Sequence, residues 1–325
     1  MLTMRTTPVR PAVVVNPSKA DDPTAHRRDV TAALEAAGLG EPLWFETTED
    51  DPGGEQCAAA FEAGADLVLA CGGDGTVRAC AAALAGGRVP LALLPAGTGN
   101  LLARNLGIPT DLAAAATVAA AGSLRRIDVP QLDGEPFVVM GGSGFDALLF
   151  ERTSDGLKSR IGWAAYALAG ARALRDAERM QITLELDGRT EVMSGVGVVV
   201  GNVGTLTAGM VLLPDAVPDD GMLDVAVLTP RRWNEWVGLA VNVVAGRRPK
   251  PWQLRQRRGS RIVVRWPKAV PVEIDGDLRE SADLLTFTVV AGALAVCVPA
   301  EAGARSDSAG VRPAAPPREQ RRDDD

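Results

Sequence analysis

The sequence predicts a parallel α/β domain followed by a mostly antiparallel β-sandwich domain. Two observations carry this prediction. Between residues 11 and 122, short runs that are apolar throughout alternate with helical patterns. Such runs indicate parallel strands in a sheet that helices cover on both faces. From about residue 126, strand-like runs separated by turns such as Asp187-Gly188 and Asp220-Gly221 indicate antiparallel strands.

The elements of the first half follow from the periodicity and the turn residues. Asn16-Pro17 ends the first strand, and Gly38 ends the first helix. The expected strands cover residues 11–17, 42–48, 65–73 and 89–97, and the expected helices cover residues 24–37, 54–63, 76–84 and 100–106.

The second half is expected to be mostly strand, with helical patterns near residues 157–178 and 232–245. We place the domain boundary near residues 122–128, which gives domains at residues 10–125 and 126–300. We expect a flexible N-terminus over residues 1–9 and a disordered tail over residues 301–325, where Val311 is the one apolar side chain larger than alanine or proline. The expected strands cover residues 137–142, 180–186, 191–202, 222–228, 261–266, 270–276 and 284–298.

Composition argues against several classes of protein. Of 325 residues, 46% are hydrophobic and 23% charged, the balance of a soluble globular protein. A single histidine, His26, argues against Ser-His-Asp and Cys-His catalysis, so the expected general base is a carboxylate. The four cysteines have no CxxC spacing, which favours a reducing compartment over a zinc site or a disulfide framework. No apolar run reaches the ~18–20 residues of a membrane span, so we expect a cytoplasmic protein that can still lie on a membrane.

Two glycine-rich loops follow neighbouring strands. The first, Gly72–Thr76, opens a helix, and its glycines let backbone N–H groups approach an anion at the helix N-terminus. Asp74 in this loop would repel a phosphate unless a cation lay between them, which favours Mg²⁺. The second loop, Gly97–Asn100, has the same setting one unit later, at the sheet edge where ligands bind. A tight turn without a ligand is the alternative for the first loop, and the second loop alone is weak evidence.

Two acidic turns lie in the β half. Asp275-Gly276-Asp277 follows an apolar run, and Asp-Gly is the commonest hairpin signal, so a plain turn is the simpler interpretation on local grounds. Residues 215–224 carry four carboxylates among turn formers. That second turn fits a cation site built from side chains and carbonyls, and it equally fits a solvated acidic turn.

A basic segment at residues 231–268 carries eleven Lys or Arg residues and one acid, Glu235, in a chain of net charge −7. It also holds four of the six tryptophans. Basic residues interleaved with tryptophan favour an anionic membrane surface, where tryptophan lies at the headgroup level. A solvated face with buried tryptophans is the alternative. No DNA- or RNA-binding motif accompanies the segment, so we expect no nucleic-acid partner.

Together these residues resemble the diacylglycerol kinase catalytic family, which includes bacterial lipid kinases and sphingosine kinases. The first loop alone is shared with NAD kinases and phosphofructokinases, whereas the combination of motifs is specific. The resemblance implies an NAD kinase- or phosphofructokinase-like nucleotide-binding domain and a β-rich lipid-substrate domain with the active site between them. It implies transfer of the γ-phosphate of ATP, with Mg²⁺, to the hydroxyl of a lipid such as diacylglycerol or a sphingoid base. The resemblance extends from about Val13 to Val298. Its motifs are Asn16-Pro17, Thr47-Thr48, Gly72–Thr76, Pro95–Asn100, Gly141–Ala147, Asp220-Gly221 and Ile274–Gly276.

The resemblance also implies residue roles. Asp275 matches the position usually assigned as the base. Asp277 stands where the family usually has glutamate, a position also proposed as the proton acceptor, but aspartate is one methylene shorter and we therefore prefer Asp275. Asp128 would join Asp74 in a network of aspartate, water and Mg²⁺. The structural Mg²⁺ site would be formed by Asp220 and the carbonyls of Val217 and Met222. The nucleotide would be held by Asn16, Pro17, Thr48, Gly72, Gly73, Asp74, Gly75, Thr76, Val77, Gly97, Thr98, Gly99 and Asn100.

Two departures and two alternatives stay open at this point. Leu101 follows the second loop where the family usually has an acidic or small residue, and the first loop, Asn16–Ala20, lacks the usual glycine. A kinase of a soluble substrate such as NAD is one alternative, although the Asn-Glu pair similar among NAD kinases occurs here as Asn234-Glu235, in the wrong region. A non-catalytic nucleotide or lipid sensor is the other. Expected partners are a lipid alcohol, the anionic inner face of the cell membrane through residues 231–268, and a second copy paired along an edge strand as a homodimer.

Overall fold

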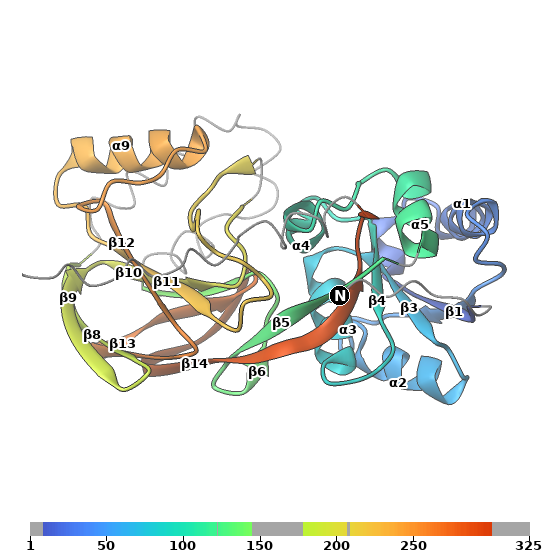
Figure 1. Ribbon diagram of the computed structural model, residues 1–325, viewed down its shortest axis with the longest axis horizontal. Coiled ribbons are helices and arrows are strands. Elements are labelled where there is room, and N and C mark those ends of the chain that lie inside the picture. Colours follow the sequence, from blue (N-terminus) through green and yellow to red (C-terminus); the bar gives the residue numbers. More distant parts are fainter. Residues whose placement is uncertain (1–8, 122, 145–177, 207–208, 301–325) are drawn as a thin grey trace, which may run out of the picture.

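The computed structural model describes residues 9–121, 123–144, 178–206 and 209–300. An α/β part and a β-rich part lie side by side along the long axis of the molecule (Figure 1). Two strands, green and red-orange in Figure 1, run between the two parts and connect them.

The α/β part is built on a four-stranded parallel sheet. All residues of its first and third strands are buried, because helices cover both faces of the sheet, and this explains why these runs are apolar throughout. The strands are β1 (Pro11–Val15), β2 (Leu43–Glu46), β3 (Leu67–Gly72) and β4 (Leu91–Pro95), in the order β4-β3-β1-β2.

The helices of this part lie on both faces of the sheet. Helices α1 (Pro23–Ala36) and α5 (Leu112–Ala121) pack together on one face, and α2 (Gly54–Glu62) and α3 (Asp74–Leu84) pack together on the other (Figure 1). Two short helices, η1 (Pro17–Lys19) and α4 (Leu101–Asn105), follow β1 and β4. Strand ends and helix starts therefore meet at one edge of the sheet.

The β-rich part is antiparallel. Its strands pair antiparallel with one another, and Phe137 and Phe287 meet edge to face in its core with ring centroids 6.2 Å apart. One helix, α9 (Trp233–Val244), is described here. The strands are β5 (Leu124–Leu132), β6 (Glu135–Pro136), β7 (Met140–Gly144), β8 (Met180–Leu186), β9 (Arg189–Gly195), β10 (Gly197–Gly201), β11 (Leu223–Leu228), β12 (Leu254–Gly259), β13 (Arg261–Ile274) and β14 (Asp277–Cys297).

Strand β14 belongs to both parts. It pairs with β13 along its first half, and near its end Val296 pairs in parallel with Leu91 of β4. Leu294 and Val296 are fully buried in the same core cluster as Val68 and Leu93 of the parallel sheet. The shared core fixes the β13–β14 hairpin relative to the parallel strand ends.

The expected elements are largely confirmed, with differences that have physical causes. Residues 137–139 are not a strand, because Val138 and Val139 donate their backbone N–H groups to the Asp275 carboxylate. The run 191–202 divides into β9 and β10, whereas the runs 261–266 and 270–276 join as β13. Helix α3 begins at Asp74, two residues before the expected start. Helix α5 was missed because alanine dominates it, and β12 because it is mostly polar.

Some predictions fall outside the described residues: the helical pattern near residues 157–178, the tail at 301–325, all but the last residue of the 1–9 terminus, and the end of the Gly141–Ala147 motif. The domain boundary near residues 122–128 stays a prediction. Among the helices that the structure describes, none is long and apolar enough to cross a membrane.

Candidate active site

The four parallel strands end side by side. The backbone ladder continues past the strand ends, since Asn16 donates its N–H to the Cys71 carbonyl and Ala96 donates to the Gly72 carbonyl, both at 3.0 Å. Thr47 donates to the last residue of β1 at 2.9 Å. The segments expected to hold a nucleotide are thereby brought to one edge, where open α/β sheets bind ligands.

The two glycine-rich loops touch each other. A Cβ on Gly97 would lie 2.6 Å from the Cα of Gly73, and a Cβ on Gly72 would lie 2.7 Å from the Thr76 side chain. A Cβ on Gly75, by contrast, would meet no atom of the described chain within 4 Å. The space over the first turn of α3 is therefore open. The first N–H groups of a helix have no intrahelical acceptor, so this turn offers a cradle for a phosphate.

Asp74 ties the two loops together. Its Oδ2 accepts the Asn100 N–H at 3.1 Å, and its Oδ1 accepts the Leu101 N–H at 2.7 Å. Asn100, with φ of +50°, closes its own loop through two hydrogen bonds between its side-chain amide and the Gly97 backbone. A Cβ on Gly99 would lie 2.5 Å from the Asp74 carboxylate. Each carboxylate oxygen keeps a lone-pair direction, so Asp74 can still reach a Mg²⁺ ion or its water.

Three other expected nucleotide contacts lie at the same edge. The Asn16 carboxamide oxygen accepts the N–H and the hydroxyl of Ser18, at 3.0 and 2.7 Å, and so caps η1. The Thr48 hydroxyl accepts the Asp51 N–H at 3.0 Å. Thr98 is exposed at the tip of the second loop. The Asn16 and Thr48 side chains therefore order their own turns.

Lys19 is a candidate that sequence reasoning missed. Its Cε lies 3.9 Å from the position that a Cβ on Gly73 would occupy, so its side chain reaches over the first glycine-rich loop. The residue ends η1, which Pro17 begins, and only the three-dimensional path of that turn brings it there. Val77, expected as a nucleotide contact, is buried in the core beneath the loop.

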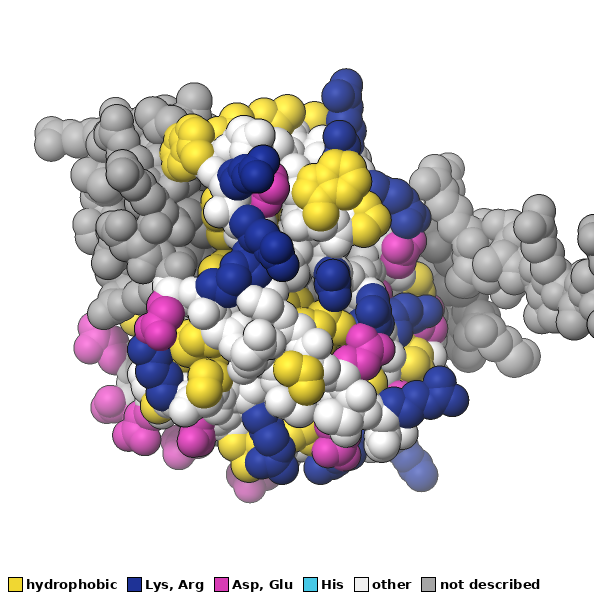
Figure 2. All heavy atoms as spheres, turned by 90° about the vertical axis from the view of Figure 1, so that its left-hand side faces the viewer, with side chains coloured by type: hydrophobic (Ala, Val, Ile, Leu, Met, Phe, Trp, Pro, Cys, Tyr) yellow, Lys and Arg dark blue, Asp and Glu magenta, His cyan; other side chains and the backbone are white. Residues whose placement is uncertain are grey.

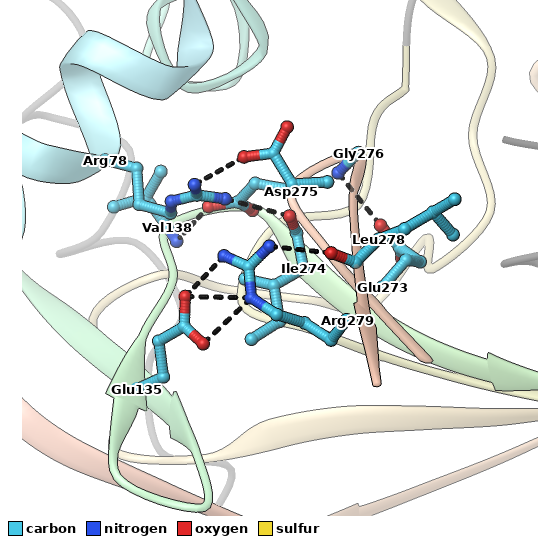
Figure 3. A network of polar contacts seen from close by, with 10 residues as sticks. Arg78, Glu135, Val138, Glu273, Ile274, Asp275, Gly276, Leu278 and Arg279 are labelled. Carbon is cyan, nitrogen blue, oxygen red and sulfur yellow. Dashed lines mark hydrogen bonds and ion pairs between the residues drawn. The ribbon is translucent and has the colours of Figure 1, made fainter. Parts of the chain in front are cut away.

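The late acidic turn is a hairpin turn and also holds a buried carboxylate. Asp275 (φ +48°) and Gly276 (φ +91°) are the two residues between β13 and β14, so the hairpin interpretation is confirmed. The Asp275 carboxylate also accepts hydrogen bonds from three backbone N–H groups, and Figure 3 labels one of these donors, Val138. Those of Val138 and Val139 lie at 2.9 Å and that of Met140 at 3.0 Å.

This environment perturbs Asp275. Burial raises the pKa of Asp275 to about 6, although the three N–H groups and the charge of Arg78 act in the opposite direction. A carboxylate offers about four lone-pair directions, so one stays available for a proton. With a pKa near 6, the group is ionised at neutral pH and is a stronger base than an exposed carboxylate.

Arg78 connects the hairpin to the first glycine-rich loop. It lies on α3, one turn after Asp74, and donates from Nη1 to the Ile274 carbonyl at 2.9 Å (Figure 3). Its Nη2 donates to Asp277 at 2.5 Å. Its side chain is 14% exposed, whereas that of Asp277 is 55% exposed. No sequence signal identifies Arg78, because it belongs to no motif and lies 196 residues from Ile274.

Further contacts hold the hairpin in place. The Gly276 N–H donates to the buried Glu273 at 2.8 Å. Beside it, Arg279 forms an ion pair with Glu135 of β6, with Nε to carboxylate distances of 2.9 and 3.1 Å (Figure 3). The Arg279 guanidinium holds the pKa of Glu135 below its ordinary value.

Asp128 lies at the other acidic turn. Its buried carboxylate accepts the N–H groups of Gly221 and Gly292, both at 2.7 Å. Burial raises its pKa, and the two N–H groups oppose the shift. Asp74 binds a different set of groups, so the described contacts do not bring Asp128 and Asp74 together. Their shared Mg²⁺ network stays a prediction.

Asp220 is engaged by protein groups. One carboxylate oxygen accepts the Met222 N–H at 3.0 Å, and the other is paired with the Arg258 guanidinium. Arg258 also lies 3.4 Å from the buried Asp224. Because a guanidinium already balances these carboxylates, a cation bound by Asp220 would have to displace Arg258. Over the described residues, no group of three or more His, Cys, Asp or Glu side chains could hold a metal ion. The Mg²⁺ site with the Val217 carbonyl stays a prediction.

Sequence comparison places the chain among kinases. The profile of the family described as "Diacylglycerol kinase catalytic domain" matches residues 10–132, and that of the "YegS C-terminal NAD kinase beta sandwich-like domain" matches residues 139–298. A Pseudomonas aeruginosa protein named "Probable lipid kinase YegS-like" is 34% identical over 281 residues, which cover 85% of this chain and 91% of that protein. The "Diacylglycerol kinase" of Bacillus subtilis is 30% identical over 218 residues, which cover 65% of this chain and 71% of that protein.

Solved structures show the same fold. A diacylglycerol kinase from Bacillus anthracis has a TM-score of 0.70 at 20% identity, over 92% of this chain and all of that one. An NAD kinase from Archaeoglobus fulgidus in complex with ATP has a TM-score of 0.51 at 15% identity, over 91% of this chain and 96% of that one. These structures confirm the predicted fold class. The chain belongs to the diacylglycerol kinase catalytic-domain family, as its motifs predicted. Membership of a kinase family implies ATP as the phosphoryl donor.

Proposed function

We propose that this protein is an ATP- and Mg²⁺-dependent lipid kinase that phosphorylates the hydroxyl of a lipid such as diacylglycerol or a sphingoid base. The observation that carries the proposal is the Arg78 contact between the two parts of the molecule. It joins the helix of the first glycine-rich loop to the hairpin that presents Asp275. A phosphate cradle and a carboxylate with a raised pKa are thereby held together, and phosphoryl transfer to a hydroxyl needs such positioning above all.

The glycine-rich loops would hold the nucleotide. The open first turn of α3 would receive the phosphates, and Lys19 would add a positive charge beside them. Thr98 and Asn16 would contact the nucleotide from the rim of the site. Mg²⁺, bound through Asp74 directly or through water, would neutralise the charge of the phosphates.

Asp275 would act as the proton acceptor. As the oxygen of the lipid hydroxyl bonds to the γ-phosphorus, its O–H bond breaks and the proton moves to the free lone pair of Asp275. The electron pair of the broken phosphorus–oxygen bond stays with ADP. Asp277 is more than half exposed and paired with Arg78, which supports an orienting role through that arginine rather than proton transfer.

The names of relatives, lipid kinase and diacylglycerol kinase, support a lipid acceptor. In the proposed setting the protein is cytoplasmic, has no nucleic-acid partner, and docks on the anionic inner face of the cell membrane through residues 231–268. Strands β2 and β12 end the main path of the sheet and leave edges along which a second copy can pair.

A kinase of NAD is the second candidate, because the fold is shared with the Archaeoglobus NAD kinase. The testing experiment therefore offers both acceptor classes. Purified protein is incubated with γ-labelled ATP, Mg²⁺ and lipid alcohols in mixed micelles, with NAD and a reaction without lipid alongside. Label on a lipid supports the proposal, whereas label on NAD alone would replace it. ATP binding without label on any acceptor would favour a sensor.

The base is tested with Asp275→Asn and the matched variant Asp283→Asn, at an exposed aspartate on β14, the strand that follows the Asp275 turn. Loss of the base lowers turnover by about 10²–10⁴-fold. Asp283→Asn should leave turnover unchanged. ATP binding and the melting temperature are measured for each variant, because Asp275 also accepts three backbone N–H groups. Turnover near that of the wild type in folded Asp275→Asn would remove Asp275 from the base role.

A further inference from the structure

Helix α9 is apolar on two faces, and the protein covers one of them. Trp236, Leu239 and Val243 are buried in the large core cluster. The Gln253 side chain holds the helix in place, because it donates to the Glu235 carbonyl at 3.1 Å and accepts from the Asn242 amide at 3.2 Å. The helix is thus firmly seated on the β-rich part.

The second apolar face of α9 is exposed. Trp233, Val237 and Val241 follow one another at intervals of four residues, which places them in one stripe along the helix. Their exposed fractions are 47%, 40% and 53%. Trp252, beside the Gln253 that holds the helix, is 56% exposed. A helix that carries apolar side chains on two faces is normally covered on both, so the exposed stripe calls for an external partner.

Positive charge flanks this stripe at both ends. Arg231 and Arg232 lie at its N-terminal end, and Arg247, Arg248 and Lys250 follow its C-terminal end; all five are exposed. The carboxylate of Glu235 is turned to the helix start, where it accepts the Arg231 N–H at 2.6 Å. Figure 2 views the molecule from this end and shows Lys and Arg side chains gathered between hydrophobic patches in its upper part.

The remaining cations of the basic segment are mostly engaged elsewhere. Four of the six on β12 and β13 have carboxylate partners: Arg257 with Glu191, Arg258 with Asp220, Arg261 with Glu185 and Lys268 with Glu178. Of the five cations that flank α9, Arg248 is also paired, with Asp215 at 2.5 Å. Within the described residues the other four have no carboxylate partner, so the cations available to an external anion are concentrated around α9. This narrows the docking surface from the whole segment to one helix and its flanks.

We propose that the exposed face of α9, with Trp252, inserts into the headgroup region of an anionic lipid bilayer. The tryptophans would lie at the interface, and the two valines would enter the acyl boundary. Arg231, Arg232, Arg247 and Lys250 would bind lipid phosphates. A second copy of the chain fits less well, because a two-fold contact would set like charges against each other. Helix α9 lies on the β-rich part, at the other end of the long axis from the strands of the parallel sheet (Figure 1).

The inference rests on the lipid-kinase function but is tested apart from it, by vesicle binding without ATP. Binding is measured by co-sedimentation with phosphatidylcholine vesicles, with and without phosphatidylglycerol. One variant removes the stripe (Trp233→Ser with Trp252→Ser) and one removes charge (Arg231→Gln with Arg247→Gln). The matched controls, on the α/β part, are Phe61→Ser, at an exposed apolar side chain on α2, and Arg28→Gln, at an exposed cation on α1.

Wild type should bind phosphatidylglycerol vesicles more tightly than phosphatidylcholine alone, and salt should weaken that binding. The stripe variant should bind at least about tenfold more weakly. The charge variant should lose about fivefold for each arginine removed. Both should keep their melting temperature and their activity on a dispersed short-chain diacylglycerol.

The inference would be overturned by wild-type binding that depends on neither salt nor anionic lipid, by an equal loss of binding in the two controls, or by a solution dimer that both α9 variants dissociate. Vesicle binding without phosphorylation of any lipid would instead refute the proposed function and leave the docking surface standing. Phosphorylation of short-chain diacylglycerol, with vesicle binding unchanged in both α9 variants, would refute the docking surface and leave the proposed function standing.

Discussion

Replacing Arg78 with methionine tests whether the two parts of the active site are coupled as the structure shows. The change removes the guanidinium and keeps much of the side-chain bulk. The Ile274 carbonyl then loses its donor, which costs about 1–3 kcal/mol if no water replaces it. The lost ion pair itself contributes little, about 0–1 kcal/mol, because Asp277 is 55% exposed. Most of the effect should therefore appear in catalysis.

Two catalytic effects are expected. The hairpin that presents Asp275 loses its anchor to α3, and a displacement of about 1 Å at a reacting group lowers turnover by about 10²-fold. The charge of Arg78 also lowers the pKa of Asp275, so its removal raises that pKa above about 6. The acidic limb of the pH profile should then move to higher pH. A merely structural role for Arg78 would not move this limb.

The assay is the pH dependence of kcat/KM, which reports the ionisation of the free enzyme. Arg78→Lys keeps the charge but not the two-pronged contact, so it should keep the acidic limb and lose part of the turnover. The control is Arg88→Met, at an exposed arginine just after the same helix. An unmoved acidic limb in Arg78→Met, with turnover near that of the wild type, would refute the reasoning.

Four other predictions follow from single contacts. The pKa of Asp275 is raised on folding, so the protonated carboxyl stabilises the folded state fully below about pH 4, and this stabilisation is lost as pH rises through about 6. In urea unfolding, the free energy of unfolding of wild type should fall by up to about 3 kcal/mol relative to Asp275→Asn over that range, and a constant difference would contradict the prediction. Gly97→Ala would place a Cβ 2.6 Å from the Gly73 backbone, so the KM for ATP should rise at least about tenfold, with thermal stability as the control. Lys19→Gln should raise the KM for ATP about five- to tenfold with little change in kcat, and an unchanged KM would exclude the ammonium from the site. The Arg258 guanidinium neutralises Asp220 and Asp224 at the acidic turn, so EDTA should leave the melting temperature of wild type unchanged. In Arg258→Ala these carboxylates lose that charge, and added Mg²⁺ should raise the melting temperature.

The parts of the fold that the sequence predicted are those where burial dictates composition. Strands β1 and β3 are buried on both faces and therefore read as continuous apolar runs. Helix α5 is ten residues of mainly alanine, and β12 is mostly polar, so neither carries the periodicity that identifies an element. Residues 137–139 have strand-like side chains but no strand, because a distant carboxylate takes their N–H groups.

The same distinction holds at the candidate site. The glycine-rich loops were predictable, because close backbone approach excludes side chains and leaves glycine in the sequence. Arg78 and Lys19 were not. An arginine in a helix and a lysine in a turn are ordinary surface residues, and only the approach of segments far apart in the chain gives them a role. Long-range contacts of this kind leave no local pattern.

Asp275 shows how one residue could satisfy a structural requirement and the proposed catalytic one together. A two-residue hairpin turn needs a residue that tolerates positive φ, and aspartate is among the few that do besides glycine. The same turn aims the carboxylate at three backbone N–H groups, which fix it in place and leave one lone pair for a proton. Burial by the neighbouring hairpin segments then raises its pKa. The local signal for a plain turn is therefore no argument against catalysis, since the turn places the carboxylate of the proposed base and contributes to its raised pKa.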